Sequence, residues 1–220
     1  MIKAVIFDMD GLLIDSNLIW VEAENKVLGK LGVPVLDNEK MVHTFGLREE
    51  EAVEYWFSKY PWQGSSKEEV LSGVIQEVVH LFKTQGKLME GANEVIELFS
   101  LQNIPIAVAS SSEMIIIETA LTKFSIKDKM KVICSAENVT KGKPEPEIYL
   151  TTAKKLEVTP SECLVFEDSI NGVLAAKAAK MKCVAVPDVR LKRNKSFNIA
   201  DLTLNSLKDF TLEHLKKLDI

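Results

Sequence analysis

Two carboxylates, Asp8 and Asp10, follow a mostly apolar run at residues 2–7 and are themselves followed by Gly11. A strand that is buried on both faces has an almost continuous apolar sequence. Alternate residues leaving a strand share a side, so the two carboxylates are expected to face one centre. Their mutual repulsion favours a bound cation or a retained proton, which suits metal-assisted acid–base or nucleophilic chemistry. The same residues are also an ordinary turn signal, and both interpretations stay open at this point.

Three consecutive serines, Ser110, Ser111 and Ser112, follow a second apolar run, Ile104–Ala109. A hydroxyl and free backbone amides at a strand end that opens a helix form an anion site. The alternative is that one of the serines caps the following helix. The two roles are compatible.

Lys143 lies in the segment Lys-Pro-Glu-Pro at residues 143–146, directly before an expected helix. The two prolines stiffen this loop, so the lysine is expected to be held in place. A fixed ammonium group near two carboxylates and a phosphate stabilises a transferring phosphoryl group. The alternative is a solvent-exposed lysine in a proline-rich turn.

Glu167, Asp168 and Ser169 follow a further apolar run, Leu164–Phe166. Hard oxygen ligands of this kind suit Mg²⁺, which binds through one or two carboxylates together with phosphate. The alternative is another helix cap. Four strand ends in one sheet that each carry an acid, a hydroxyl or a lysine are too many for coincidence, and together they favour one shared site.

The apolar runs alternate with helix-like stretches over most of the chain. Such alternation implies right-handed crossovers and a parallel sheet, so the predicted class is α/β with a Rossmann-like core. The expected strands are Ala4–Phe7, Ile104–Ala109, Val132–Cys134, Leu164–Phe166, Val184–Val186 and, more weakly, Ala200–Leu204. The expected core helices are Ala92–Gln102, Glu113–Phe124, Glu147–Leu156 and Gly172–Lys180.

A mostly helical segment separates the first strand from the others. Its expected helices are Leu18–Leu31, Arg48–Lys59 and Lys67–Phe82, joined by turn-rich sequences. We therefore predict a catalytic core at residues 1–16 and 88–220 and a helical cap at residues 17–87. A helical insertion just after a catalytic strand is well placed to cover the site as a lid.

The amino-acid composition narrows the possible classes of protein. The 220 residues carry a net charge of −5 and are 46% hydrophobic, which is normal for a globular protein and argues against general affinity for nucleic acid. No apolar stretch approaches the length of a membrane span, and the N-terminus does not resemble a signal peptide. Cys134, Cys163 and Cys183 are expected to be buried reduced thiols. We expect a cytoplasmic protein, with a monomer as the default.

The four polar strand ends also have the order and composition of a known set of motifs. They resemble the four motifs of the haloacid dehalogenase-like hydrolases, over the whole chain. The helical insertion looks like the cap of the branch that holds β-phosphoglucomutase and small sugar-phosphate phosphatases. Residues 8–16, 46–48, 55–56 and 61–64 look like those of the hexitol and 2-deoxyglucose-6-phosphate phosphatases within it.

The resemblance implies a role for each core residue. Asp8 would be the nucleophile that forms an aspartyl-phosphate. Asp10 would protonate the leaving sugar oxygen and then activate water. Ser110, with the backbone amide of Ser111, would bind phosphoryl oxygens, and Lys143 would neutralise the nucleophile and the phosphate.

The same resemblance implies Mg²⁺ as the cofactor. Its ligands would be Asp8, the backbone carbonyl of Asp10, and Asp168. Glu167 would stand behind them or ligate through water. The cation would keep a dianionic phosphate from repelling the attacking carboxylate.

Substrate choice is expected to lie mainly in the cap. Arg48 is the best candidate there for a small phosphorylated sugar, because guanidinium binds oxyanions bidentately, and a solvated charge is the alternative. Gly11 is a further candidate for substrate binding. Trp20 is expected to lie at the site, whereas aromatics such as Trp56 and Trp62 are more often core.

The resulting hypothesis is a Mg²⁺-dependent phosphatase of small sugar or sugar-alcohol phosphates. A β-phosphoglucomutase-like mutase is the first alternative, and a non-catalytic phosphosugar-binding protein is the second. The mutase branch carries a cap histidine at the position of Trp20, so its absence here favours water as the phosphoryl acceptor.

Overall fold

A single parallel sheet organises the part of the chain that the computed structural model describes, residues 1–34 and 43–219. Its six strands lie in the order β3-β2-β1-β4-β5-β6, and every neighbouring pair is parallel. The predicted α/β class with a Rossmann-like sheet is confirmed. The strands are β1 (Ala4–Phe7), β2 (Ile106–Ser110), β3 (Met130–Ser135), β4 (Cys163–Glu167), β5 (Lys182–Ala185) and β6 (Leu202–Thr203).

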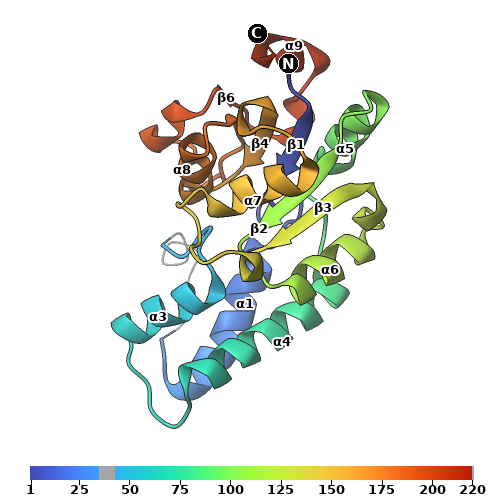
Figure 1. Ribbon diagram of the computed structural model, residues 1–220. Coiled ribbons are helices and arrows are strands. Elements are labelled where there is room, and N and C mark those ends of the chain that lie inside the picture. The colour runs from blue at the N-terminus through green and yellow to red at the C-terminus, as the bar shows by residue number, and fades with distance from the viewer. Residues whose placement is uncertain (35–42, 220) are drawn as a thin grey trace.

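Helices cover both faces of the sheet, as crossovers between parallel strands require (Figure 1). Short 3₁₀ turns lie at residues 29–31, 127–129, 136–138, 160–162, 195–199 and 207–209. The helices around the sheet are α5 (Ala92–Leu101), α6 (Met114–Lys123), α7 (Glu147–Leu156), α8 (Ile170–Ala178) and α9 (Leu212–Leu218).

Successive side chains of β1 enter two different apolar cores, as the period of a strand dictates. Val5 and Phe7 pack with residues of α5, α6 and α9 on one face of the sheet. Ala4 and Ile6 pack with residues of α7 and α8 on the other face. All four side chains are fully buried, so the strand is fixed in register on both sides.

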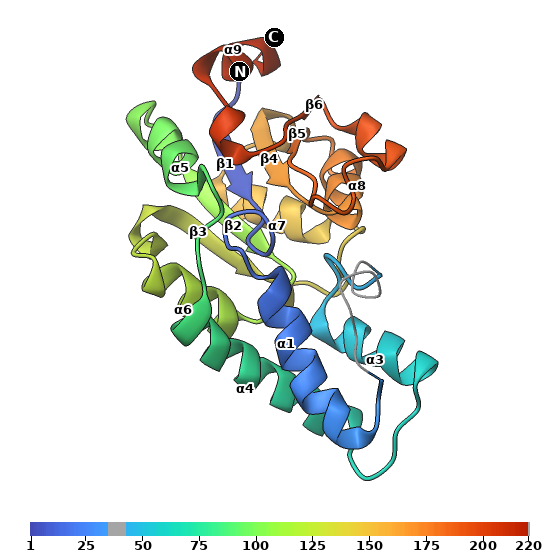
Figure 2. The same cartoon turned by 180° about the vertical axis from the view of Figure 1, so that it is seen from behind.

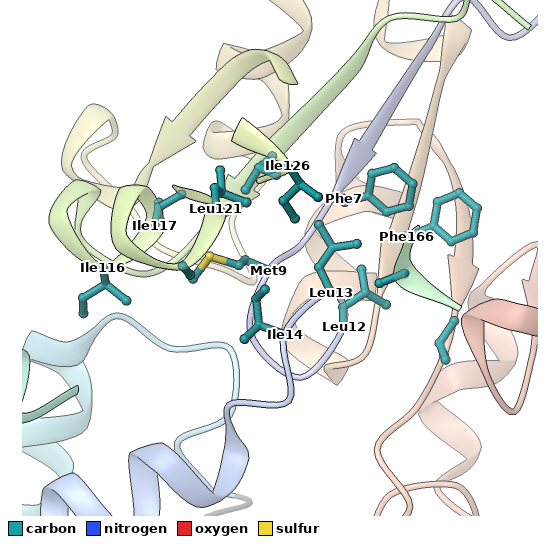
Figure 3. Close-up of a cluster of buried hydrophobic side chains, with 14 of the residues drawn as sticks. Phe7, Met9, Leu12, Leu13, Ile14, Ile116, Ile117, Leu121, Ile126 and Phe166 are labelled. Atoms are coloured by element: carbon teal, nitrogen blue, oxygen red, sulfur yellow. The ribbon is translucent and has the colours of Figure 1, made fainter. Parts of the chain in front are cut away.

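The loop after β1 continues the first of these cores. Figure 3 shows Met9 reaching toward Ile117 and Leu121 of α6, and Phe7 beside Phe166 of β4, with ring centroids 4.9 Å apart. Because Met9 is buried, the two acids on either side of it are turned away from this core. The apolar residue between the two carboxylates therefore anchors the loop that presents them.

A helical lobe lies beyond one end of the sheet, on the side toward which the strand arrows point (Figures 1 and 2). It contains α1 (Asn17–Leu28), α3 (Glu49–Lys59) and α4 (Lys67–Gln85). Both α1 and α3 pack against α4. Both ends of the described chain lie at the opposite end of the molecule.

Most element boundaries differ slightly from those expected from the sequence. The strand expected from Ile104 begins at Ile106, because Pro105 has no N–H for the ladder. The helix expected to reach Leu31 ends at Leu28, and a 3₁₀ turn follows, closed by Gly32 with a φ of 80°. The predicted β6 shrinks to two residues at the sheet edge.

The three cysteines are free and buried, as expected. Among the described residues, no helix is long and apolar enough to cross a bilayer.

Candidate active site

The central strands β1, β2 and β4 bring three of the four polar strand ends to one edge of the sheet. Phe7 is paired with Val108 on one side and Phe166 on the other, so the residues that follow these strands lie together. Ligands of such sheets bind at the carboxyl ends of the strands. The fourth group, Lys143, reaches the same point from the loop before α7.

Lys143 links two acids in a buried network. Its Nζ lies 2.5 Å from Oδ1 of Asp8 and 2.6 Å from Oε1 of Glu167, and its side chain is 1% exposed. Burial lowers the pKa of Lys143, but the two carboxylates outweigh it and raise the pKa above its usual range. Because it is buried and ion-paired, the alternative of a solvent-exposed lysine is wrong.

Both carboxylate oxygens of Glu167 are occupied by protein donors. Oε1 accepts from Lys143 and from the hydroxyl of Tyr149, 2.5 Å away. Oε2 accepts from the backbone N–H groups of Asp168 and Ser169 and from the Ser169 hydroxyl. Ser169 also caps α8 by accepting from Gly172 N–H. The geometry therefore makes Glu167 a buried positioning acid that holds the lysine and its own loop.

Asp10 lies apart from this network and is held by different donors. Oδ1 accepts from the indole Nε1–H of Trp20, 3.0 Å away. Oδ2 accepts from the hydroxyls of Ser112, at 2.9 Å, and Ser110, at 3.3 Å. Three donors fix this carboxylate: one comes from α1 and two come from residues 110–112, here called the serine loop.

The serine loop faces the site and does not cap α6. The N-cap residue of α6 is Glu113, which makes no side-chain cap bond, so the capping alternative is wrong. Ser111 donates its hydroxyl to the carbonyl of Gly46, 2.9 Å away. The hydroxyl of Ser110 accepts from the backbone N–H of Ser112.

A cluster of three buried carboxylates fits a divalent cation. Oxygens of Asp8, Glu167 and Asp168 lie within 4.8 Å of one another. Burial raises the pKa of Asp8 to about 8, against the opposing effect of Lys143. Burial and the charges of Asp8 and Glu167 raise the pKa of Asp168 well above its usual range. One lysine does not balance this charge, and Asp8 with Asp168 is the pair whose oxygens suit a cation.

A cavity of about 60 Å³ joins these groups to the helical lobe. Its floor is the acids and the serine loop, and its roof is α1, α3 and residues 44–47. The polar or charged residues that the lobe contributes to the lining are Asn17, Trp20, Glu24, Thr44 and Glu49.

Comparisons with known proteins show the family of the chain. Residues 5–186 match the model of the haloacid dehalogenase-like hydrolase family. The chain belongs to the haloacid dehalogenase-like hydrolases. It is 38% identical to hexitol phosphatase B of Escherichia coli strain K12, over 97% of this chain and 96% of that protein. The family and this relative identify the chain as a phosphatase enzyme.

Two solved structures of other haloacid dehalogenase-like proteins share the fold closely. β-Phosphoglucomutase from Clostridium difficile superposes with a TM-score of 0.86 at 26% identity, covering 99% of this chain and 97% of that one. CbbY from Rhodobacter sphaeroides, in complex with phosphate, superposes with a TM-score of 0.86 at 25% identity, covering 95% and 96%.

Two residues expected to bind substrate in this hydrolase have other surroundings. Arg48 precedes α3, pairs with Glu51 at 3.3 Å and packs beside Gly142, and it is not among the described residues that line the cavity. The N–H of Gly11 donates to Ile14 and Ser16. With a φ of +77°, Gly11 leaves room for Asp168, whose Oδ2 would lie 2.3 Å from an added Cβ.

Sequence reasoning about this hydrolase missed several residues at the site. Tyr149 bonds Glu167 from α7, and Ser112 bonds Asp10. Glu24 lies four residues after Trp20 on α1, so the two share a helix face, which is a signal that the sequence did contain. Glu49 has no such signal, because an acid in the first helical turn is ordinary. Trp56 and Trp62 are buried in the lobe, as expected.

The fixed carboxylate of Glu167 yields a stability prediction for Gly172. A Cβ added to Gly172 would lie 1.7 Å from Oε1 of Glu167. The Glu167 carboxylate cannot move away easily, because five donors hold its two oxygens. We expect Gly172→Ala to lower the free energy of unfolding by about 2 kcal/mol or more, although alanine is the better helix former. Urea unfolding measures the change.

Gly73 on α4 is the matched control. A Cβ there meets only the side chain of Val27, at 3.4 Å, so Gly73→Ala is expected to raise stability by up to about 1 kcal/mol. A Gly172→Ala variant as stable as Gly73→Ala would contradict the fixed position of Glu167.

Proposed function

We propose that this enzyme is a Mg²⁺-dependent phosphatase that hydrolyses small sugar or sugar-alcohol phosphates through an aspartyl-phosphate. One observation carries the proposal. Two acids face one small cavity, and each has a different set of donors: Asp8 is paired with Lys143, and Asp10 is held by Trp20 and two serines. Such separate surroundings suit a nucleophile and a general acid.

In the first step Asp8 attacks phosphorus. Lys143 binds Oδ1 of Asp8, so we assign the attack to Oδ2. The bond between phosphorus and the sugar oxygen breaks, and Asp10 delivers its proton to that oxygen. The serine loop supplies Ser110 and the amide of Ser111 to the phosphoryl oxygens, where negative charge accumulates.

In the second step Asp10 takes a proton from a water molecule. The oxygen of that water attacks phosphorus, the bond to Asp8 breaks, and inorganic phosphate leaves. Trp20 and Ser112 keep the Asp10 carboxylate directed into the cavity through both steps, while the Ser110 hydroxyl turns from Asp10 to the phosphoryl group. Donors that hold the carboxylate in a productive orientation lower the entropic part of the activation barrier.

Asp8 and Asp168, with the backbone carbonyl of Asp10, would hold the Mg²⁺, and Glu167 would support them from behind. When bound, the cation supplies positive charge to the phosphoryl group and to the attacking carboxylate. The acid cluster and the raised pKa values of Asp8 and Asp168 support this assignment.

The helical lobe is proposed to act as a cap, residues 17–87, over a core of residues 1–16 and 88–220. Because the lobe roofs the cavity that the acids line, we infer that a sugar phosphate enters when the lobe moves away. The name of the hexitol phosphatase relative supports a sugar or sugar-alcohol phosphate as substrate. Three buried thiols suit a reducing cytoplasm, and we propose a monomer there.

The test is phosphate release from a panel of hexose, hexitol, deoxyhexose and pentose phosphates, ranked by kcat/KM. We expect turnover with Mg²⁺ and a loss of at least about 100-fold when EDTA removes it, because the attacking carboxylate then faces an unshielded dianion. Restoring Mg²⁺ in excess is the control for irreversible damage.

The same assay separates the mutase alternative. β-Glucose 1-phosphate with a bisphosphate primer would give glucose 6-phosphate in a mutase and inorganic phosphate in a phosphatase. Formation of glucose 6-phosphate as the main product would overturn the phosphatase assignment. Binding without any turnover would favour the non-catalytic alternative.

A further inference from the structure

Two acids of the helical lobe line the cavity although the reaction proposed above gives them no task. Glu24 on α1 is 6% exposed, and Glu49, the first residue of α3, is 9% exposed. Buried carboxyl groups normally have hydrogen-bond partners, because leaving them unpaired costs free energy. Both residues therefore need an explanation.

Each acid has one buried oxygen that the protein leaves without a partner. Among residues 1–34 and 43–219, no hydrogen bond of good geometry reaches Oε2 of Glu24 or Oε2 of Glu49, although Glu113 lies beside Glu49. The indole nitrogen of Trp56 lies near Glu24 but also lacks a bond of good geometry. Both residues line the cavity, and buried polar groups without a protein partner beside a cavity are typical of groups that a ligand completes.

The position of Glu24 suits the far end of a substrate. Trp20 holds Asp10 at the floor of the cavity, and Glu24 follows one helical turn later on the same face of α1. One turn advances about 6 Å along the helix, so a ligand touching Asp10 and Glu24 together is a chain of several atoms. Glu49 lies close enough to Glu24 for their charges to interact.

The charges around this end of the cavity exclude a second anion. The described residues that line the cavity include no lysine, arginine or histidine. Burial raises the pKa of Glu24 to about 8, and burial with the charges of Glu113 and Asp10 raises the pKa of Glu49. A protonated carboxyl group both donates and accepts hydrogen bonds, so it matches a hydroxyl group of a ligand. It carries no negative charge, so it does not favour a ligand with an ammonium group.

We propose that Glu24, with Glu49 beside it, binds the hydroxyl groups at the non-phosphorylated end of an uncharged polyol chain and so determines substrate specificity. The proposal rests on the phosphatase function above and narrows its substrate to a monophosphate with free hydroxyls at the other end. A site built to bond a hydroxyl strongly rejects ligands that leave its buried polar groups unpaired.

The test compares two variants on two substrates in the presence of Mg²⁺. Glu24→Met keeps the length of the side chain but removes its hydrogen bonds, whereas Glu24→Gln keeps a donor and an acceptor. For sorbitol 6-phosphate we expect Glu24→Met to lower kcat/KM at least about 10-fold and Glu24→Gln to stay within about 3-fold of wild type. For p-nitrophenyl phosphate, which has no hydroxyls to bind, both variants are expected within about 2-fold.

Three results would overturn the assignment: equal losses on both substrates with Glu24→Met, no loss on either, or equal losses on sorbitol 6-phosphate with both variants. The first assigns Glu24 to cap structure, and the third assigns the effect to charge. A hexose 1,6-bisphosphate is expected to have a kcat/KM at least about 10-fold below its 6-monophosphate, and equality would also overturn it. Failure of the proposed function itself differs, because wild type would then release no phosphate from any substrate.

Discussion

Asp8→Asn is expected to lower kcat for Mg²⁺-dependent phosphate release at least about 10⁴-fold, because an amide is not a nucleophile toward phosphorus. The substitution keeps the shape of a side chain that is 6% exposed. Lys143 retains Glu167 as its ion-pair partner, so the buried network is not left with an isolated cation. We expect the free energy of unfolding to change by less than about 2 kcal/mol.

Asp15→Asn is the matched control for the loss of a negative charge in the same loop. Asp15 is exposed and is not among the described residues that line the cavity. Its variant is expected to keep kcat within about 2-fold of wild type. Residual turnover above about 1% of wild type in Asp8→Asn would remove Asp8 from the role of nucleophile.

Lys143→Met is expected to have the largest effect on stability. It leaves Asp8 and Glu167 buried side by side without their shared cation, and loss of one partner from a buried ion pair costs about 3–5 kcal/mol. Urea unfolding in EDTA measures this without metal bound to the acids. Lys141→Met, an exposed lysine in the same loop, is the control and is expected to change stability by less than about 0.5 kcal/mol.

A double variant identifies the cause of that loss. Adding Asp8→Asn to Lys143→Met removes one of the two repelling carboxylates, so we expect the double variant to be more stable than Lys143→Met by at least about 1 kcal/mol. Additive losses would mean that the lysine contributes through packing alone. Activity is expected to be lost in both, so stability is the informative readout.

The sheet and its catalytic edge were predictable because both depend on local sequence. Buried parallel strands require continuous apolar runs, and β1 and β4 appear in the sequence as such runs followed by acids. Parallel strands place their carboxyl ends at one edge, so the sequence alone predicted that Asp8, Ser110 and Glu167 lie together. The turn that the sequence also allowed is present at residues 11–13, where Gly11 packs on Asp168, and it leaves both carboxylates at the cavity.

The cap side of the site was not predictable, because it depends on how separate helices meet the sheet. Arg48 was favoured for its chemistry, but the start of α3 directs it toward Glu51 and Gly142. Glu24 looks like an ordinary helical acid until the lobe buries it over the cavity. Likewise, Tyr149 belongs to an amphipathic helix, and only its tertiary position gives its hydroxyl to Glu167.

The hydrogen bond between Ser111 and Gly46 couples two equilibria: anion binding at the loop of Ser111 and docking of the roof segment that contains Gly46. Ser111 belongs to the loop proposed to bind the phosphoryl group, and Gly46 belongs to the segment that roofs the cavity. Asn171 holds the neighbouring carbonyl of Phe45 in the same way, at 3.2 Å. Coupling between two such equilibria is reciprocal: an anion that orders the loop favours the docked roof, and docking tightens the anion by the same factor. If the proposed function holds, inorganic phosphate, the product, favours the docked state of the roof. The factor by which docking tightens phosphate binding then equals the factor by which phosphate favours docking, so product inhibition reports the same coupling free energy.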